Sequence, residues 1–321
     1  MKNAALRASW RFPLIRTLSS RRPVILLYHD TPAAAFPTSL DRGVFERHVR
    51  FLTEHFDVIS ASDRRRSRRG IDRIQVLVTF DDGFRNNAEV AVPILRKYRV
   101  PAVFFVCSRH ATPGRYLWFS YLRALERHFP GNGFTFRREF MDMTSTQRGA
   151  TVARLREHLL NLQPHPSAMY TAIENELPRL EDFVSPGELE DRYAGMTEEQ
   201  VQAIAADPLF DVGGHTADHP FLTRCTPDEA TSQIETNRRW VERQTSRACR
   251  AIAYPSGDYD GQVLDSCERL GVSEGYAVAA RLRGRRELQL PRIGIYAAGL
   301  DVLGFKVQWG NALRALGLRV G

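Results

Sequence analysis

Two adjacent aspartates, Asp81 and Asp82, follow an apolar run and precede a glycine in the stretch VTFDDGF, residues 78–84. Neighbouring carboxylates repel one another, and in a half-buried place this repulsion raises the pKa of at least one of them. There are two explanations for such a pair. It caps a turn, as aspartate before glycine often does, or one carboxylate holds a cation while the other transfers protons.

Two histidines, His215 and His219, lie four residues apart in the stretch HTADH. If this segment turns helically, both imidazoles face the same way and can reach one cation. An isolated pair with this spacing is more often a surface feature. Together with one aspartate of the Asp81–Asp82 pair, however, the histidines supply two nitrogen ligands and one oxygen ligand. Three protein ligands and one open position are typical of a catalytic divalent-metal site.

The remaining chain pattern favours a barrel-type α/β domain that would position these residues. Short apolar runs, such as residues 24–29, 74–80 and 102–107, alternate with segments of helical periodicity, which indicates βα units around a parallel sheet. Residues from about 111 to 195 break this alternation, because they are mostly helical and polar. We interpret residues 111–195 as a helical insertion or lid.

The candidate residues share one place relative to the predicted strands. His29, the two aspartates, His215 and Pro255 each lie at the end of a predicted strand or just after it. In parallel α/β barrels the active-site residues gather at the carboxyl ends of the strands. The sequence therefore predicts that these groups meet at one rim of the barrel.

Arginine dominates the charge of the chain, which has 321 residues and a net charge of +8. The densest clusters lie in residues 63–70 and 281–286. We interpret them as a solvated face, and the alternative is attraction to anionic lipid headgroups or to an anionic glycan. No recognisable nucleic-acid-binding module accompanies the charge, so we expect no nucleic-acid partner.

The N-terminal residues 1–22 are basic, contain no acidic residue, and are expected to form a tail ahead of the domain. They lack the unbroken apolar core of a signal peptide, and no segment approaches the roughly 18 apolar residues of a membrane span. The four cysteines form no CxxC pair, so we expect buried free thiols, as in a reducing compartment. These features favour a cytoplasmic protein, with peripheral contact to an anionic membrane as the alternative.

Three motifs, TFDDG, HTADH and AYPSG, occur in this order, and with them the chain resembles the polysaccharide deacetylases of carbohydrate esterase family 4. These proteins share the chitooligosaccharide-deacetylase homology domain. YHD near the N-terminus and LPRI near the C-terminus also resemble bacterial members. The resemblance covers roughly residues 24–295, interrupted by the insertion. It implies a distorted (β/α) barrel of about seven parallel strands, which we expect as a single domain over residues 23–321.

The resemblance also implies a role for each motif residue. Asp82, His215 and His219 would hold a divalent metal ion, and Asp81 would be the general base that activates water. Zinc suits two nitrogen ligands and one oxygen ligand, whereas cobalt, nickel and iron are the alternatives. The backbone N–H of Ser256 would stabilise the oxyanion that develops when the acetamide of an N-acetyl sugar is attacked.

The chain departs from much of the family at two places. Many members have a late histidine in an LxH motif, but this chain has no histidine after His219. His29 is therefore the expected general acid, and a scaffold or substrate-contact role is its alternative. Many members also place an arginine two residues before the motif proline, where this chain has Ala253. Arg292 is expected to supply that positive charge beside Asp81.

The leading hypothesis is a metal-dependent N-deacetylase acting on an N-acetylhexosamine unit of a glycan or of a lipid-linked glycan precursor. A hydrolase of small non-sugar amides is a second hypothesis, although the intact metal-ligand set argues against it. A catalytically inactive glycan-binding protein is a third. The paired aspartates disfavour the third hypothesis, whereas the missing late histidine leaves it open.

Overall fold

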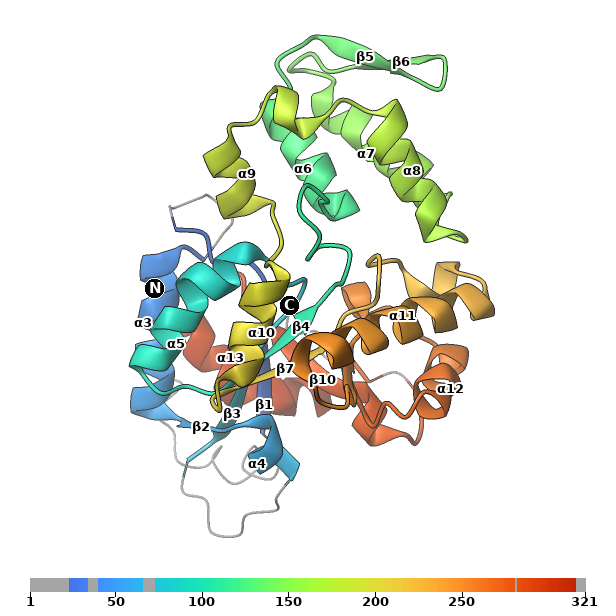
Figure 1. The fold of residues 1–321 in the computed structure, drawn as a ribbon. Coiled ribbons are helices and arrows are strands. Elements are labelled where there is room, and N and C mark those ends of the chain that lie inside the picture. The colour runs from blue at the N-terminus through green and yellow to red at the C-terminus, as the bar shows by residue number, and fades with distance from the viewer. Residues whose placement is uncertain (1–22, 34–39, 66–72, 281, 316–321) are drawn as a thin grey trace.

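The computed structural model in Figure 1 describes residues 23–33, 40–65, 73–280 and 282–315. Its main body is a closed barrel of seven parallel strands, in the order β1-β10-β9-β8-β7-β4-β3, and β3 pairs again with β1. The predicted barrel of about seven parallel strands is confirmed. The seven strands are β1 (Val24–Tyr28), β3 (Gln75–Phe80), β4 (Ala102–Val106), β7 (Phe210–Gly214), β8 (Ala251–Ala253), β9 (Glu274–Ala277) and β10 (Leu290–Gly294).

The barrel strands are apolar because both of their faces are buried. Successive side chains point alternately into the barrel and outwards to the layer of helices. In β1, for example, Ile25 packs with Leu77 and Val103 in one apolar cluster. Its neighbour Leu26 belongs to the larger cluster that includes the helices. A short eighth strand, β2 (Asp57–Val58), pairs with the first residues of β3.

Helices surround the barrel in the expected alternation with the strands. A capping box of Thr197 and Gln200 begins α10, and Pro227 is the first residue of α11. A π-helical segment leads from the aspartate loop into α5. The helical elements of this layer are α3 (Arg42–His55), α4 (Ala61–Arg65), η2 (Asn87–Ala91), α5 (Val92–Lys97), α10 (Glu198–Ala206), η4 (Leu222–Arg224), α11 (Pro227–Thr245), η5 (Pro255–Gly257), α12 (Gly261–Arg269), η6 (Arg286–Gln289) and α13 (Leu300–Ala315).

Between β4 and α10 the chain leaves the barrel and forms a separate group of helices with an apolar cluster of its own. Figure 1 shows this group at the top, on the opposite side of the barrel from α4. Because it begins directly after β4, it lies at the carboxyl end of the strands. Its elements are α6 (Trp118–His128), β5 (Gly133–Phe136), β6 (Glu139–Asp142), α7 (Arg148–Leu160), α8 (Pro166–Glu176), η3 (Leu180–Asp182) and α9 (Pro186–Arg192).

The amino end of the barrel is closed by an ion-pair network. Arg64 of α4 is almost fully buried, and its Nη2 atom lies 2.7 Å from Glu274 Oε1 and 3.0 Å from Glu287 Oε2. The Tyr276 hydroxyl donates a further hydrogen bond of 3.0 Å to Glu274. A buried carboxylate is stable only with such partners. Helix α4 therefore covers the amino end of the barrel, and its Arg64 neutralises the charge of Glu274 in β9.

Several sequence-based predictions concern residues outside the described part of the chain. These include the tail over residues 1–22 and most of the arginine cluster in residues 63–70. Within the described residues, no helix combines the length and the apolar character needed to cross a bilayer. All four cysteines are free; Cys107, Cys249 and Cys267 are buried as predicted, whereas Cys225 is partly exposed.

Candidate metal centre and active site

The aspartate loop departs sharply from the end of β3. Asp81 still donates its N–H to the Tyr28 carbonyl, as a continuing strand would, but Asp82 and Gly83 have φ angles of 73° and 77°. Left-handed backbone at a non-glycine residue is unusual and is often found at functional sites. A Cβ atom on Gly83 would lie 2.8 Å from Val106 Cγ1, so glycine is also required by the close packing against β4.

The two histidines come from the loop that follows β7, and this loop is not helical. The helical turn that would bring the two imidazoles of HTADH together is therefore absent, and the loop achieves this in another way. Thr216 and His219 have φ angles of 64° and 54°, and these two left-handed residues bend the loop so that its two imidazoles converge. Helical spacing does not predict this bend. The sequence also gives no local signal for it, because no glycine lies between the two histidines.

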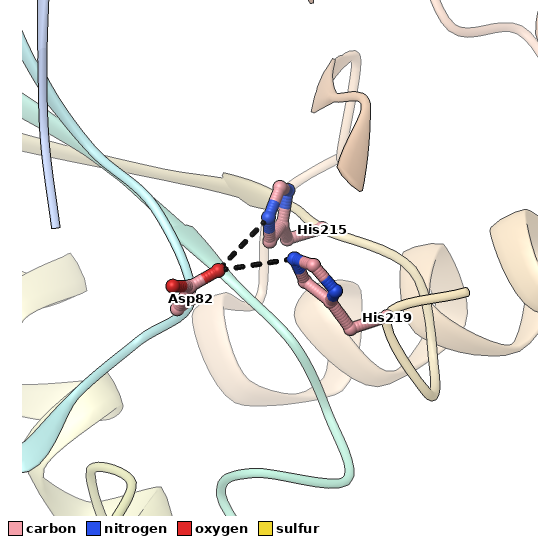
Figure 2. Close-up of side chains that lie close together, drawn as sticks. All are labelled: Asp82, His215 and His219. Atoms are coloured by element: carbon pink, nitrogen blue, oxygen red, sulfur yellow. Dashed lines mark ion pairs between the residues drawn. The ribbon is translucent and has the colours of Figure 1, made fainter. Parts of the chain in front are cut away.

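Figure 2 shows the two imidazole rings pointing at the same carboxylate. The Nε2 atoms of His215 and His219 each lie 3.2 Å from Asp82 Oδ1, and all three side chains are buried. One ligand atom from each residue lies within 4.8 Å of those from the others. Burial raises the pKa of Asp82, but hydrogen bonds and positive charge from the two imidazoles in their protonated form outweigh burial and lower the pKa well below its usual range. Asp82 is therefore anionic.

The hydrogen bonds of these side chains fit a cation between them. His215 Nδ1 lies 2.8 Å from the Ala253 carbonyl and must donate to it, so Nε2 of the neutral ring carries no proton. Its lone pair then faces the Asp82 carboxylate, whose Oδ1 has no hydrogen-bond donor among the described residues. Two converging imidazole nitrogens and a carboxylate oxygen are suitable ligands for a divalent metal ion, and the geometry does not select zinc over cobalt, nickel or iron.

The other aspartate of the pair, Asp81, is held by Arg292 from β10. Both guanidinium Nη atoms donate to the two carboxylate oxygens at 2.6 Å, and both side chains are buried. Nη1 also contacts Thr79 Oγ1 at 3.3 Å. Burial raises the pKa of Asp81, but the charge of Arg292 outweighs burial and lowers the pKa below its ordinary value. Position 253 holds an alanine, so it supplies no positive charge. The charge beside Asp81 comes instead from Arg292.

A cavity of about 780 Å³ opens beside these groups, and all the predicted site residues line it. His29 follows β1, and its ring stacks on Tyr296 with the centroids 5.8 Å apart. Its Nδ1 atom is buried and has no hydrogen-bond partner within the described chain. Ser256 lies at a left-handed turn with φ 54°, next to Pro255 in η5. The predicted residues His29, Asp81, Asp82, His215, His219, Ser256 and Arg292 therefore meet at one rim of the barrel.

The helical insertion braces the loop that carries His215 and His219. Trp118 Nε1 donates to the His219 carbonyl at 3.1 Å, and the Tyr170 hydroxyl donates to the Asp218 carbonyl at 2.9 Å. The ring of Phe119 lies 4.9 Å from that of His219. Trp118 belongs to the core of the insertion and also lines the cavity, as Phe119 does. The insertion is therefore part of the wall of the site.

Sequence reasoning missed the residues that hold the ligands in place. Asn237 of α11 accepts from the His215 N–H at 2.9 Å and donates to the Val106 carbonyl at 3.0 Å. Gln233, one turn earlier, bonds both the backbone and the carboxylate of Asp218. The ring of His110 lies between the carbonyls of Asp82 and Tyr193. Buried amides four residues apart on the apolar face of α11 were the one available signal.

Comparison with known proteins supports the same family. A family model described as polysaccharide deacetylase matches residues 69–127 and 186–275, on either side of most of the insertion. The chain is 20% identical over 292 residues to YxkH, a protein of Bacillus subtilis (strain 168) named after the polysaccharide deacetylases. This match covers 87% of the present chain and 74% of YxkH.

Two solved structures have a similar fold. IcaB from Ammonifex degensii superposes with a TM-score of 0.58 and 16% identity, covering 90% of this chain and 97% of IcaB. The Streptococcus pyogenes deacetylase PplD, solved in complex with acetate, superposes with a TM-score of 0.53 and 18% sequence identity. The superposition covers 86% of this chain and 92% of PplD. These two likenesses show the fold. The matching family model and the match to YxkH, together with the ordered motifs and the buried Asp–His–His triad, place the chain in the polysaccharide deacetylase family.

Proposed function

We propose that the protein is a metal-dependent N-deacetylase that hydrolyses the acetamide of an N-acetylhexosamine unit in a glycan or a lipid-linked glycan precursor. One observation carries the proposal. The two adjacent aspartates have different partners, since Asp82 faces two imidazoles and Asp81 is bound by Arg292. This arrangement separates the carboxylate that holds a cation from the carboxylate that moves a proton.

A divalent cation at the triad would supply Lewis-acid activation of water and of the amide carbonyl. Asp81 is anionic beside Arg292 and accepts a proton from the attacking water. The backbone N–H of Ser256 donates to the oxyanion that forms on the acetamide. His29 donates a proton to the leaving nitrogen, a role supported by its unpartnered Nδ1 atom and its place in the cavity wall.

Acetate release is the direct test of this proposal. Purified protein is assayed on N-acetylchitooligosaccharides and on lipid-linked N-acetylated sugars, before and after treatment with a chelator. We expect release that the chelator abolishes and that added divalent metal restores. The substitution Asp81→Asn should lower the rate by about 10²–10⁴-fold, because it removes the base and keeps the size of the side chain. Asp207→Asn, which lies outside the cavity beside Arg96, is the matched control.

The alternatives give different results in the same assay. Chelator-insensitive turnover of small amides without acetate release would favour a hydrolase of non-sugar amides. Saturable glycan binding without any turnover in the metal-loaded protein would favour an inactive glycan-binding homologue. Either result would replace the deacetylase proposal.

A further inference from the structure

The cavity beside the metal centre has two arginines on the side formed by the insertion. Arg123 of α6 and Arg156 of α7 both line it, together with barrel residues such as Asp30. Arg123 follows Trp118 and Phe119 by about one helical turn, so the face of α6 that carries the aromatic wall also carries this charge. The cations therefore belong to the substrate-facing side of the insertion.

Arg123 forms no ion pair with any residue that the structure describes. Several exposed arginines in the described chain have a carboxylate partner, as Arg96 has in Asp207 and Arg137 has in Glu176. For Arg123, no carboxylate of the described residues lies within ion-pair distance. Burial raises the pKa of Asp30, and Arg123 is the leading charge that lowers it, so the two groups interact only across the cavity without direct contact.

The second cation, Arg156, is only partly compensated. Its Nη1 atom lies 3.0 Å from Glu157, but the Glu157 side chain is 58% exposed and does not line the cavity. The Arg156 guanidinium lies 5.9 Å from the centroid of the Trp118 ring, and both residues line the cavity. Such an exposed ion pair is weak, and an anion in the cavity can compete for Arg156.

The other charges of the cavity are already balanced. Asp81 is bound by Arg292, and Asp82 belongs to the metal-ligand triad. Asp30 is the one further carboxylate among the lining residues of the described chain, against the two arginines of the insertion. The insertion side of the cavity therefore has an excess of positive charge, and concave surfaces concentrate the attraction of such a charge for anions.

We propose that the acetylated substrate carries an anionic group, a phosphate or a carboxylate, that binds Arg123 and Arg156 while its acetamide lies at the metal centre. The inference rests on the proposed deacetylase function and narrows it to anionic substrates. Arginine suits this role because its planar guanidinium can donate two parallel hydrogen bonds to either kind of anion. A neutral glycan would offer no anionic group to pair with either arginine of the insertion.

Binding measurements test the proposal without relying on turnover. The full-length protein is titrated by calorimetry with N-acetylglucosamine 1-phosphate, with a disaccharide of glucuronate and N-acetylglucosamine, and with neutral N,N′-diacetylchitobiose. The first two ligands distinguish phosphate from carboxylate as the source of the charge. We expect at least one of them to bind about tenfold or more tightly than the neutral sugar, as charge-assisted hydrogen bonds provide, and salt should weaken this preference.

Matched variants test which arginines cause the preference for anionic sugars. The double variant Arg123→Gln with Arg156→Gln should lose it, whereas Arg127→Gln with Arg154→Gln should keep it. The control removes the same charge from the same two helices, at positions that do not line the cavity. Equal affinity for charged and neutral sugars, or a preference that survives Arg123→Gln with Arg156→Gln, would overturn the proposal.

Acetate release from the same three compounds distinguishes the two proposals. If neutral and anionic sugars release acetate equally well, and the double variant behaves like wild type, the deacetylase function stands and the anion preference is wrong. If none releases acetate but the charged sugars still bind through the two arginines, the preference stands and the deacetylase function is wrong.

Discussion

At the scale of single residues, the site depends on buried charges that have few but well-placed partners. Asp81 and Arg292 are each almost fully buried and share two short hydrogen bonds. Such a pair adds little net stability compared with apolar packing, but removing one partner leaves the other charge unpaired in the interior. Its value for function lies in fixing the orientation and the anionic state of the Asp81 carboxylate.

The substitution Arg292→Met therefore tests the pair through stability. We expect the free energy of unfolding, measured by urea denaturation, to fall by about 3–5 kcal/mol, because Asp81 is left without a counter-charge. Combining it with Asp81→Asn should recover part of that loss, since the unpaired charge is then removed as well. If the two substitutions were simply additive, Asp81 and Arg292 would not be coupled.

At the scale of elements, the candidate metal ligands are positioned by groups that lie outside the cavity. Asn237 on α11 joins the end of β4 to the first residue after β7, and so fixes the backbone of His215. A Cβ atom on Gly214 would lie 2.6 Å from Asn237 Oδ1, which explains the glycine at the strand end. Groups of this kind commonly affect metal affinity although they are not ligands.

The substitution Asn237→Ala should weaken metal binding by about 10–100-fold, because it removes the acceptor of the His215 N–H and one of the two donors to the Val106 carbonyl. The measurement is a competition titration with a metal-binding dye. Gln244→Ala near the end of the same helix is the control, since its side chain contacts only exposed Gln202 in the described hydrogen bonds. Unchanged affinity in Asn237→Ala would show that the loop holds its geometry without this residue.

Particular elements show what could be predicted from the sequence. The strands with continuous apolar runs, such as β1 and β4, were predictable because burial on both faces leaves a clear pattern. Strand β9, EGYA, was not, since Glu274 is buried only through its pairing with distant Arg64. The hairpin β5–β6 was missed because its turn places Arg137 and Arg138 at positive φ, where glycine or asparagine is the usual signal.

The same contrast holds for the candidate site. The residues proposed as metal ligands and as general base were recognisable because they lie in short local motifs at strand ends. Their supports were not, because Asn237 and His110 act through contacts between distant segments. The bend that brings His215 and His219 together also depends on left-handed residues, which no helical spacing predicts.

At the scale of the whole molecule, the first and last parts of the chain are joined on the outside of the barrel. His48 of α3 is fully buried, and its ring nitrogens lie 3.4 Å from the Tyr28 hydroxyl and 3.3 Å from the Ala298 carbonyl. These contacts connect α3 with β1 and with the segment that leads into α13. Burial lowers the pKa of His48 to about 4, because a charged imidazole is poorly solvated there.

His48 should therefore make the stability of the whole fold depend on pH. The unfolded chain binds a proton at this residue below about pH 6.5, but the folded chain does so only near pH 4. The contribution is present in full above pH 6.5 and is lost as the pH falls from 6.5 to 4, by roughly 3 kcal/mol. In denaturation curves across this range, His48→Gln should lose less stability than wild type. Parallel losses in the two proteins would contradict the assignment.

The most direct test of the central claim is the metal content of the protein. Wild-type protein and the His215→Asn variant are incubated with a divalent metal, freed of unbound ions, and analysed by elemental mass spectrometry. We expect about one ion per wild-type chain, in keeping with a single three-ligand site, and almost none in the variant. A wild-type protein that retains no metal, or a variant that retains as much, would contradict the assignment of Asp82, His215 and His219 as a metal centre.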